Sequence, residues 1–218
     1  IGYFFSPIYT KFALTAFGWE KTLNTFLYFI IFGMVAAIFL RGVKKEKTSN
    51  NNIKINNQTL NEAIKEALNH KGFILLTFGF FVCGFNITLV SAHIPGYIQE
   101  RGFETWTAFA ILSLIGLFNV FGTLTFGYFS GKYSKRILLS ILYFARGIVL
   151  FLFLILPTST YVAIGFGILY GYLWLATIPP TNGIISQIFG TKYLGTLYGL
   201  VFFSHQIGSF LGAYLGGY

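Results

Sequence analysis

The sequence has 218 residues, of which 55% are hydrophobic and only 10% are charged, and its formal net charge is +9. A soluble domain carries roughly 25% charged residues, so this composition excludes an ordinary cytosolic enzyme, a nucleic-acid-binding protein and a disordered chain. The chain has six glutamates, no aspartate and one cysteine, Cys83. It therefore has no intrachain disulfide and no cysteine-rich metal site. We expect a membrane protein without a cofactor and without a nucleic-acid partner.

The predicted elements are membrane helices, because a span needs about 20 mostly apolar residues. Residues 1–17 look like the end of one helix, interrupted by Pro7 and Lys11. Six complete spans follow, over 22–40, 72–92, 105–127, 137–156, 161–184 and 194–217. These runs are too long for barrel strands and do not alternate polar with apolar residues. The sequence thus predicts an all-α, polytopic transmembrane helix bundle with about six complete spans and part of a seventh.

A long polar linker, residues 41–71, separates the first two helical segments from the rest. Most of it is of low complexity, which is typical of a flexible stretch. Near its end, Thr59 and Glu62 have the spacing of a helix capping box. The apolar residues that follow fall on one face: Leu60, Ile64, Ala67 and Leu68. We predict a short amphipathic helix over about 60–69, lying on the membrane surface or leading into the next span.

Basic residues distinguish the two sides of the membrane. The loops 18–21, 93–104 and 157–160 hold only Lys21 and Arg101, whereas eleven basic residues lie in the loops 41–71, 128–136 and 185–193. The positive-inside rule places the second set in the cytoplasm. We therefore divide the chain into helices over 1–40, a basic cytoplasmic linker over 41–71 and a transmembrane bundle over 72–218. We expect a multi-pass protein of the plasma (inner) membrane, in contact with lipid.

Arg146 is the only charged side chain deep in a span, about halfway along 137–156. Burying a charge in a bilayer is costly, so such a residue is a candidate functional residue. Its planar guanidinium could bind a carboxylate substrate through two hydrogen bonds. Alternatively, Arg146 ties helices together or satisfies an unpaired backbone carbonyl.

Two pairs of polar residues share helical faces and are further candidates for substrate binding. Asn86 and His93 are seven residues apart, and Asn119 and Thr123 are four apart. Asn86 lies deep in its span and is well placed to face a cavity. His93 lies near the outer end of the same span, where the alternative is a histidine at the membrane interface.

The last predicted span contains His205 and Gln206 at its middle. An imidazole there could relay a proton or bind an anion, or it could bond a neighbouring helix without moving a proton. In the preceding span, Pro179 and Pro180 lack backbone donors and should bend or break the helix. Carbonyls freed at a broken helix often line a cavity, although such a kink can also serve packing alone.

Small residues recur every four positions in the last span, at Gly208, Gly212 and Gly216, and one pair earlier at Gly195 and Gly199. This spacing lets another helix backbone approach closely. We expect that helix to belong to the same polypeptide rather than to a second copy.

Several stretches resemble the major facilitator superfamily of transporters. The loop Gly127-Tyr-Phe-Ser-Gly-Lys-Tyr-Ser-Lys-Arg136 is similar to the second glycine–basic loop of that superfamily, with Gly127 and the ending Lys135-Arg136 matching and Gly131 at the usual acidic position. Other stretches look like a bacterial branch near the monocarboxylate transporters and the oxalate/formate antiporters: 18–19, 80–85, 92–97, 179–183, 188–190 and 204–217.

The resemblance implies the second half of a twelve-helix transporter, from the end of helix 5 to helix 11, whose partner is the missing N-terminal half. It also implies alternating access, as a symporter or antiporter, for a small monocarboxylate-like organic anion. Animal monocarboxylate transporters carry an aspartate and an arginine in the eighth helix, where this chain has Asn119 and Thr123. The alternatives are a membrane-embedded enzyme and a facilitator that exports a small hydrophobic compound.

Overall fold

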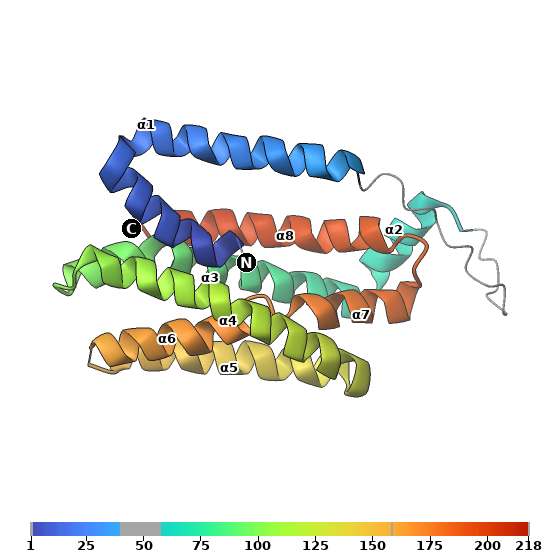
Figure 1. The fold of residues 1–218 in the computed structure, drawn as a ribbon. Helices are drawn as coiled ribbons and strands as arrows, with labels where there is room; N and C mark the ends of the chain where they lie inside the picture. Colours follow the sequence, from blue (N-terminus) through green and yellow to red (C-terminus); the bar gives the residue numbers. More distant parts are fainter. Residues whose placement is uncertain (1, 40–57, 158, 218) are drawn as a thin grey trace. The chain divides into compact units, whose positions relative to one another are not determined.

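Eight α-helices make up the computed structural model, which describes residues 2–39, 58–157 and 159–217 and has no strand within them (Figure 1). The helices are α1 (Gly2–Phe39), α2 (Leu60–Asn69), α3 (Lys71–Glu100), α4 (Thr105–Lys132), α5 (Lys135–Ile155), α6 (Thr160–Leu173), α7 (Ile178–Phe189) and α8 (Leu194–Leu215). The predicted all-α fold class is confirmed. The chain forms two compact units, Ile1–Ile8 with Thr59–Tyr218, and Tyr9–Gln58. Residues 41–57 of the predicted linker lie outside the described residues.

Four helical segments of the described chain are long and apolar enough to cross a membrane: Lys71–Glu100, Thr105–Lys132, Lys135–Ile155 and Thr160–Phe189. They coincide with four of the six predicted spans. Residues 22–39 and 194–215 of the other two predicted spans are also helical, within α1 and α8, but these helices are not among the four. In α8, the polar run Ser204, His205 and Gln206 lowers the apolarity of the middle of the helix.

The first helix, α1, consists of two helical segments joined at Gly18, whose φ of 76° and ψ of 173° are not helical. A positive φ is readily adopted only by glycine, which explains why the chain turns at this position. The turn falls where the sequence predicts the loop 18–21. Beyond Pro7, the ring of Tyr9 makes edge contacts with Phe26 and Phe29, at 5.8 and 6.3 Å between ring centroids.

The predicted short helix is present as α2, and its capping box is confirmed. The Thr59 N–H donates to Glu62 Oε2 at 2.8 Å, and the Glu62 N–H donates to Thr59 Oγ1 at 3.4 Å. Hydrogen bonds from the Thr59 backbone and side chain hold the pKa of the Glu62 carboxyl below its usual value. This cap therefore stabilises α2 above the usual glutamate pKa and is lost as the pH falls through the lowered one.

The apolar face of α2 is only partly packed. Ala67 is buried and Ile64 packs beside it, against a core that includes Phe73 of α3. Leu60 and Leu68 stay exposed. Successive residues of a helix are about 100° apart, so Leu68 points away from the stripe centred on Ala67. The two exposed leucines lie at either end of α2, where the membrane surface can accept them.

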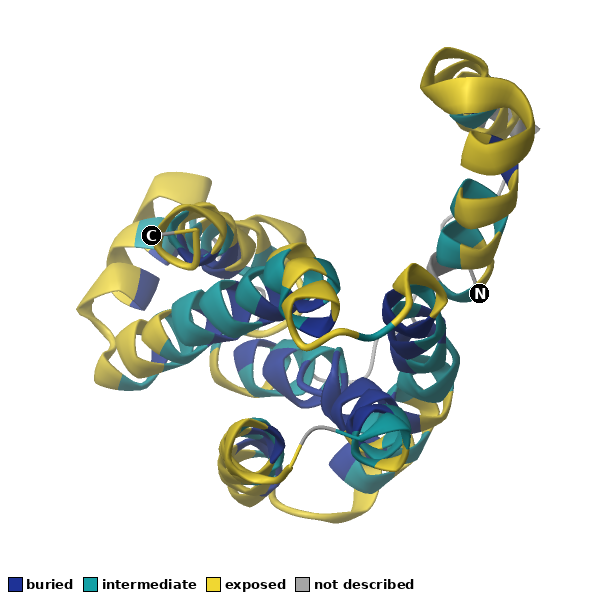
Figure 2. Ribbon diagram, turned by 90° about the vertical axis from the view of Figure 1, so that its left-hand side faces the viewer, coloured by how far each residue is buried: buried dark blue, intermediate teal, exposed yellow. Residues whose placement is uncertain are grey.

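Within residues 59–217, the buried residues gather on the helix faces that point toward one another, and the exposed residues lie on the outer faces (Figure 2). The closest helix pairs are α3 with α8 and α4 with α6. Each pair runs parallel. In the first pair, Thr77 and Gly84 of α3 contact Ser204 and Ser209 of α8. In the second pair, Ile111 and Ile115 of α4 lie against Gly167 and Gly171 of α6. The outer faces carry large apolar side chains, as expected for helices in lipid.

The glycines of α8 bring its backbone against α3. A Cβ added at Gly208 would overlap the carbonyl oxygen of Phe81, and one at Gly212 would overlap that of Phe85. On the facing helix, a Cβ at Gly84 would overlap the carbonyl oxygen of His205. The predicted packing within one polypeptide is thus confirmed for this part of the stripe. Gly195 and Gly199 differ, because nothing lies within 4 Å of a Cβ added at either.

Candidate functional site

The helix that carries the proline pair is broken, as the sequence predicts. Its first half, α6, ends at Leu173, and its second half, α7, begins at Ile178 with Pro179 and Pro180 in its first turn. The Ile178 N–H, which in a continuous helix would bond the Trp174 carbonyl, bonds that of Leu175 instead, at 3.0 Å. The break therefore releases the Leu173 and Trp174 carbonyls from the helical pattern, and such groups need other partners in a membrane.

Arg146 of α5 supplies those partners. Its Nη2–H group donates to the carbonyl oxygens of Leu173, at 2.5 Å, and of Trp174, at 2.8 Å. Its Nη1–H donates to the Sγ atom of Cys83 on α3, at 3.0 Å. The side chain is only 2% exposed, and its Nε has no hydrogen-bond partner in the described chain. Arg146 thus joins α5, the break and α3.

Asn119 of α4 accepts a hydrogen bond from a backbone N–H group of the same break. Its Oδ1 accepts hydrogen bonds from the Leu175 N–H, at 3.1 Å, and from Thr123 Oγ1, at 3.3 Å. Asn119 and Thr123 share a face of α4, as their spacing predicts. The break is therefore fastened from two neighbouring helices, with Arg146 on its carbonyls and Asn119 on an N–H group.

Two further side chains belong to this cluster, and the sequence reasoning missed them. Cys83 is buried, and its Sγ lies 3.7 Å from Oγ1 of Thr177 in the break. Tyr170 is fully buried on α6 and donates to the backbone carbonyl of Asn86, at 3.3 Å. Asn86 thus lies beside the cluster, with its backbone making this contact. No sequence signal separates Cys83 from the apolar residues around it.

The charge of Arg146 is not matched by a carboxylate in the described part of the chain. All glutamates described there lie outside the middle of the four candidate spans, at Glu20, Glu62, Glu66, Glu100 and Glu104. Carbonyl dipoles and a thiol solvate the guanidinium, but they carry no formal charge unless the thiol ionises. A buried cation of this kind attracts an anion strongly, because the surroundings screen charge poorly.

The two candidate histidines, His93 and His205, lie on the α3–α8 contact, and the His205 side chain also hydrogen-bonds the Cys83 side chain that Arg146 contacts. His205 is buried, its Nδ1 lies 3.3 Å from Gln206 Oε1 and 3.4 Å from Ser209 Oγ, and its ring stacks on Phe202. His93 Nε2 lies 3.1 Å from the carbonyl oxygen of Ala213 near the end of α8. Among the predicted site residues, the structure thus brings Arg146, Asn119 and Thr123 together at the break and places Asn86 and His205 beside them, through Tyr170 and Cys83. His93 and Gln206 lie outside this cluster.

A polytopic helix bundle with a fastened break in one span defines the class as a multi-pass membrane protein. The sequence model of the Major Facilitator Superfamily matches residues 1–213. The chain therefore belongs to this superfamily, which consists of membrane transporters and not of enzymes.

Three curated proteins illustrate the similarity. The uncharacterised MFS-type transporter YcxA of Bacillus subtilis (strain 168) is 27% identical over 97% of this chain and 52% of its own length. Monocarboxylate transporter 12-B of Danio rerio is 26% identical over 67% of this chain and 31% of its own. MFS transporter asaE of Aspergillus flavus is 24% identical over 90% of this chain and 42% of its own. The chain thus spans about half the length, or less, of these relatives.

Proposed function

We propose that the chain is the C-terminal half of a plasma-membrane transporter that moves a small organic anion by alternating access. Membership of the superfamily supports secondary transport. The similarity to a monocarboxylate transporter supports an anionic substrate. The chain's share of its relatives' length is consistent with one of two halves that rock about a site near the membrane midplane.

The observation that carries the proposal is the buried guanidinium of Arg146, which has no carboxylate partner in the described chain. A carboxylate substrate would neutralise this charge through the planar, two-donor geometry that arginine offers. The carbonyls of Leu173 and Trp174 now occupy Nη2. In our proposal the substrate takes their place in another state of the transport cycle, when the break straightens or shifts.

Uptake by the full-length protein in liposomes tests the substrate class. The probes are radiolabelled small monocarboxylates, such as acetate, lactate and pyruvate, together with the uncharged amide of each acid. We expect saturable uptake of at least one acid and none of its amide. Uptake of the amides, or transport restricted to uncharged hydrophobic compounds, would replace the proposal with the alternative of a hydrophobic-compound exporter.

We propose His205 as the proton-coupling residue of this half, because no carboxylate lies in the middle of its candidate spans. Its Nδ1 lies 3.3 Å from Gln206 Oε1 and 3.4 Å from Ser209 Oγ, and imidazole is the side chain type best suited to proton relay near neutral pH. An imposed pH gradient should drive accumulation by the wild type but not by His205→Gln, which should still exchange substrate for substrate. If the variant accumulates substrate in response to the gradient, another residue couples the proton.

A further inference from the structure

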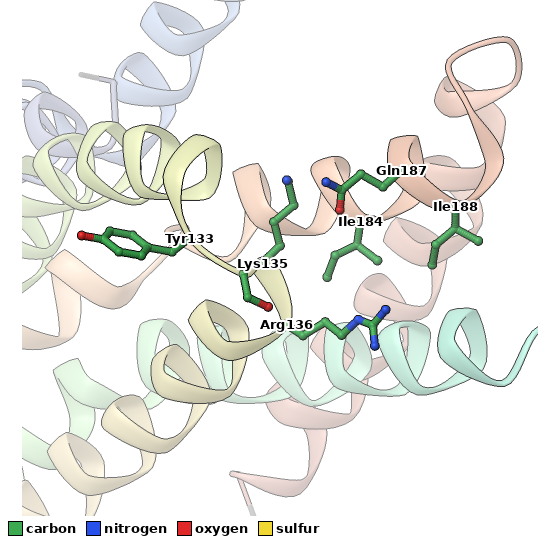
Figure 3. Close-up of a pocket in the computed structure, with 7 residues that line it drawn as sticks. Tyr133, Lys135, Arg136, Ile184, Gln187 and Ile188 are labelled. Atoms are coloured by element: carbon green, nitrogen blue, oxygen red, sulfur yellow. The ribbon is translucent and has the colours of Figure 1, made fainter.

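A basic pocket of about 370 Å³ lies at the end of the bundle that the charge distribution places in the cytoplasm. It forms where α4 turns into α5 and where α7 ends, and it is lined by Tyr133, Ser134, Lys135, Arg136, Ile184, Gln187 and Ile188. Lys135 extends toward Gln187, whereas Arg136 leaves α5 in another direction, along Ile184 and Ile188 (Figure 3). The two cations thus lie on different parts of the same pocket.

Neither cation is neutralised in the described chain. No aspartate or glutamate lines the pocket, and neither the Lys135 ammonium nor the Arg136 guanidinium makes a hydrogen bond or ion pair with another described residue. The Ser140 hydroxyl donates only to the backbone carbonyl of Arg136. Both also occupy the first turn of α5, where the helix dipole disfavours positive charge. The positive-inside rule explains why the loop is basic but does not explain a cavity around its cations. The pocket is complementary to an anionic group.

An apolar groove of about 590 Å³ continues from this pocket. It shares Arg136, Ile184 and Ile188 with the pocket, and its further lining is His70, Gly72, Leu75, Leu76, Gly79, Leu139, Ser140 and Tyr143. From Arg136 to Tyr143 it follows α5 for about 10 Å into the apolar part of the bundle. Leu75 is 71% exposed, and Phe78 of α3 and Phe144 of α5 are also exposed. The groove therefore opens toward lipid.

We propose that this continuous surface binds one anionic phospholipid of the cytoplasmic leaflet. Its phosphate lies against Lys135 and Arg136, with Gln187 as an additional hydrogen-bond partner, and an acyl chain lies along Leu75 and Leu139. A free phosphate ion would fill only the basic pocket and would leave the groove without a role. Basic pockets between membrane helices on the cytoplasmic side are suited to anionic headgroups. The inference does not depend on the substrate or on Arg146.

Lipid titration of the full-length protein in neutral detergent tests the inference, with bound lipid counted by native mass spectrometry. We expect dioleoylphosphatidylglycerol to bind about tenfold or more tightly than dioleoylphosphatidylcholine. The double variant Lys135→Gln/Arg136→Gln should lose this preference. The matched control is Lys132→Gln/Lys192→Gln, which removes two charges from the same side of the membrane, at residues that lie over tyrosine rings outside the pocket. The control should keep the preference.

The groove is tested separately by Gly79→Leu, which adds apolar bulk next to the Tyr143 ring without changing charge. This variant should weaken phosphatidylglycerol binding but not the binding of inorganic phosphate. Thermal unfolding without added lipid shows whether each variant is folded. If a variant is not folded, the headgroup preference of the wild type alone tests the lipid proposal. Equal binding of the two lipids by the wild type overturns the proposal. The proposal is also overturned if inorganic phosphate binds at Lys135 and Arg136 and Gly79→Leu changes neither phosphate binding nor phosphatidylglycerol binding.

Discussion

Arg146→Lys is expected to abolish uptake, or to raise its KM at least tenfold, and to lower the thermal stability of the protein. The guanidinium reaches three acceptors on two other helical segments, the Leu173 and Trp174 carbonyls and the Cys83 sulfur. A lysine ammonium keeps the charge but has a single nitrogen on a shorter side chain, so it cannot span the acceptors on both segments as Nη1 and Nη2 do. Each carbonyl left unpaired in the membrane costs about 1–3 kcal/mol. Substrate uptake in liposomes and the unfolding temperature in detergent measure the two effects.

The two measurements separate the roles of Arg146. A fall in unfolding temperature with an unchanged KM would show that Arg146 has only a structural role, which is to hydrogen-bond the carbonyls of the α6–α7 break. A raised KM at nearly normal stability would support direct contact with substrate. Arg101→Lys is the matched control, since Arg101 is exposed at the end of α3 and lies over the ring of Tyr97. We expect it to change neither quantity.

Gly208→Ala is expected to prevent normal folding or to reduce the yield of folded protein severely. The added Cβ would overlap the carbonyl oxygen of Phe81, so α8 would have to move away from α3. Helix pairs in membranes depend on such close backbone approach, and backbone atoms cannot repack as a flexible side chain can. The yield of monodisperse protein after detergent extraction, and its unfolding temperature, measure the effect.

Gly199→Ala is the matched control in the same helix. Nothing lies within 4 Å of its added Cβ, and alanine is about 1 kcal/mol more favourable than glycine inside a helix. This variant should therefore be as stable as the wild type or slightly more stable. If both variants were equally harmful, crowding against α3 would not explain the effect of Gly208→Ala.

The break and its principal residue could be predicted from the sequence, but the partners of that residue could not. Two adjacent prolines must interrupt a helix, and an arginine in an apolar span must find acceptors. The acceptors are mostly backbone carbonyls, which every residue carries and which no sequence pattern marks. Cys83 is 63 residues from Arg146 and occupies an ordinary apolar position. Only the three-dimensional arrangement of α3, α5 and the break brings these groups together.

The sequence predicts that α8 packs closely against another helix, but it does not predict which helix. The glycine spacing of α8 indicates a close helix neighbour, yet it does not identify that neighbour as α3. It also does not distinguish Gly208 and Gly212, which contact α3, from Gly195 and Gly199, which do not. The polar residues His205 and Gln206 are adjacent in sequence but differ in burial, since His205 is buried and Gln206 is exposed.

The pairing of α3 with α8 has a consequence for biosynthesis. Gly84 of α3 and Ser209 of α8 are in contact but are 125 residues apart in the chain. At a synthesis rate of 5–20 residues per second, the face of α3 that includes Gly84 waits about 6 to 25 s for its partner to emerge. During that interval its close-packing surface is open to lipid, to the insertion machinery or to the wrong helix. Translation speed across residues 101–193 is therefore expected to affect how much of the protein assembles correctly.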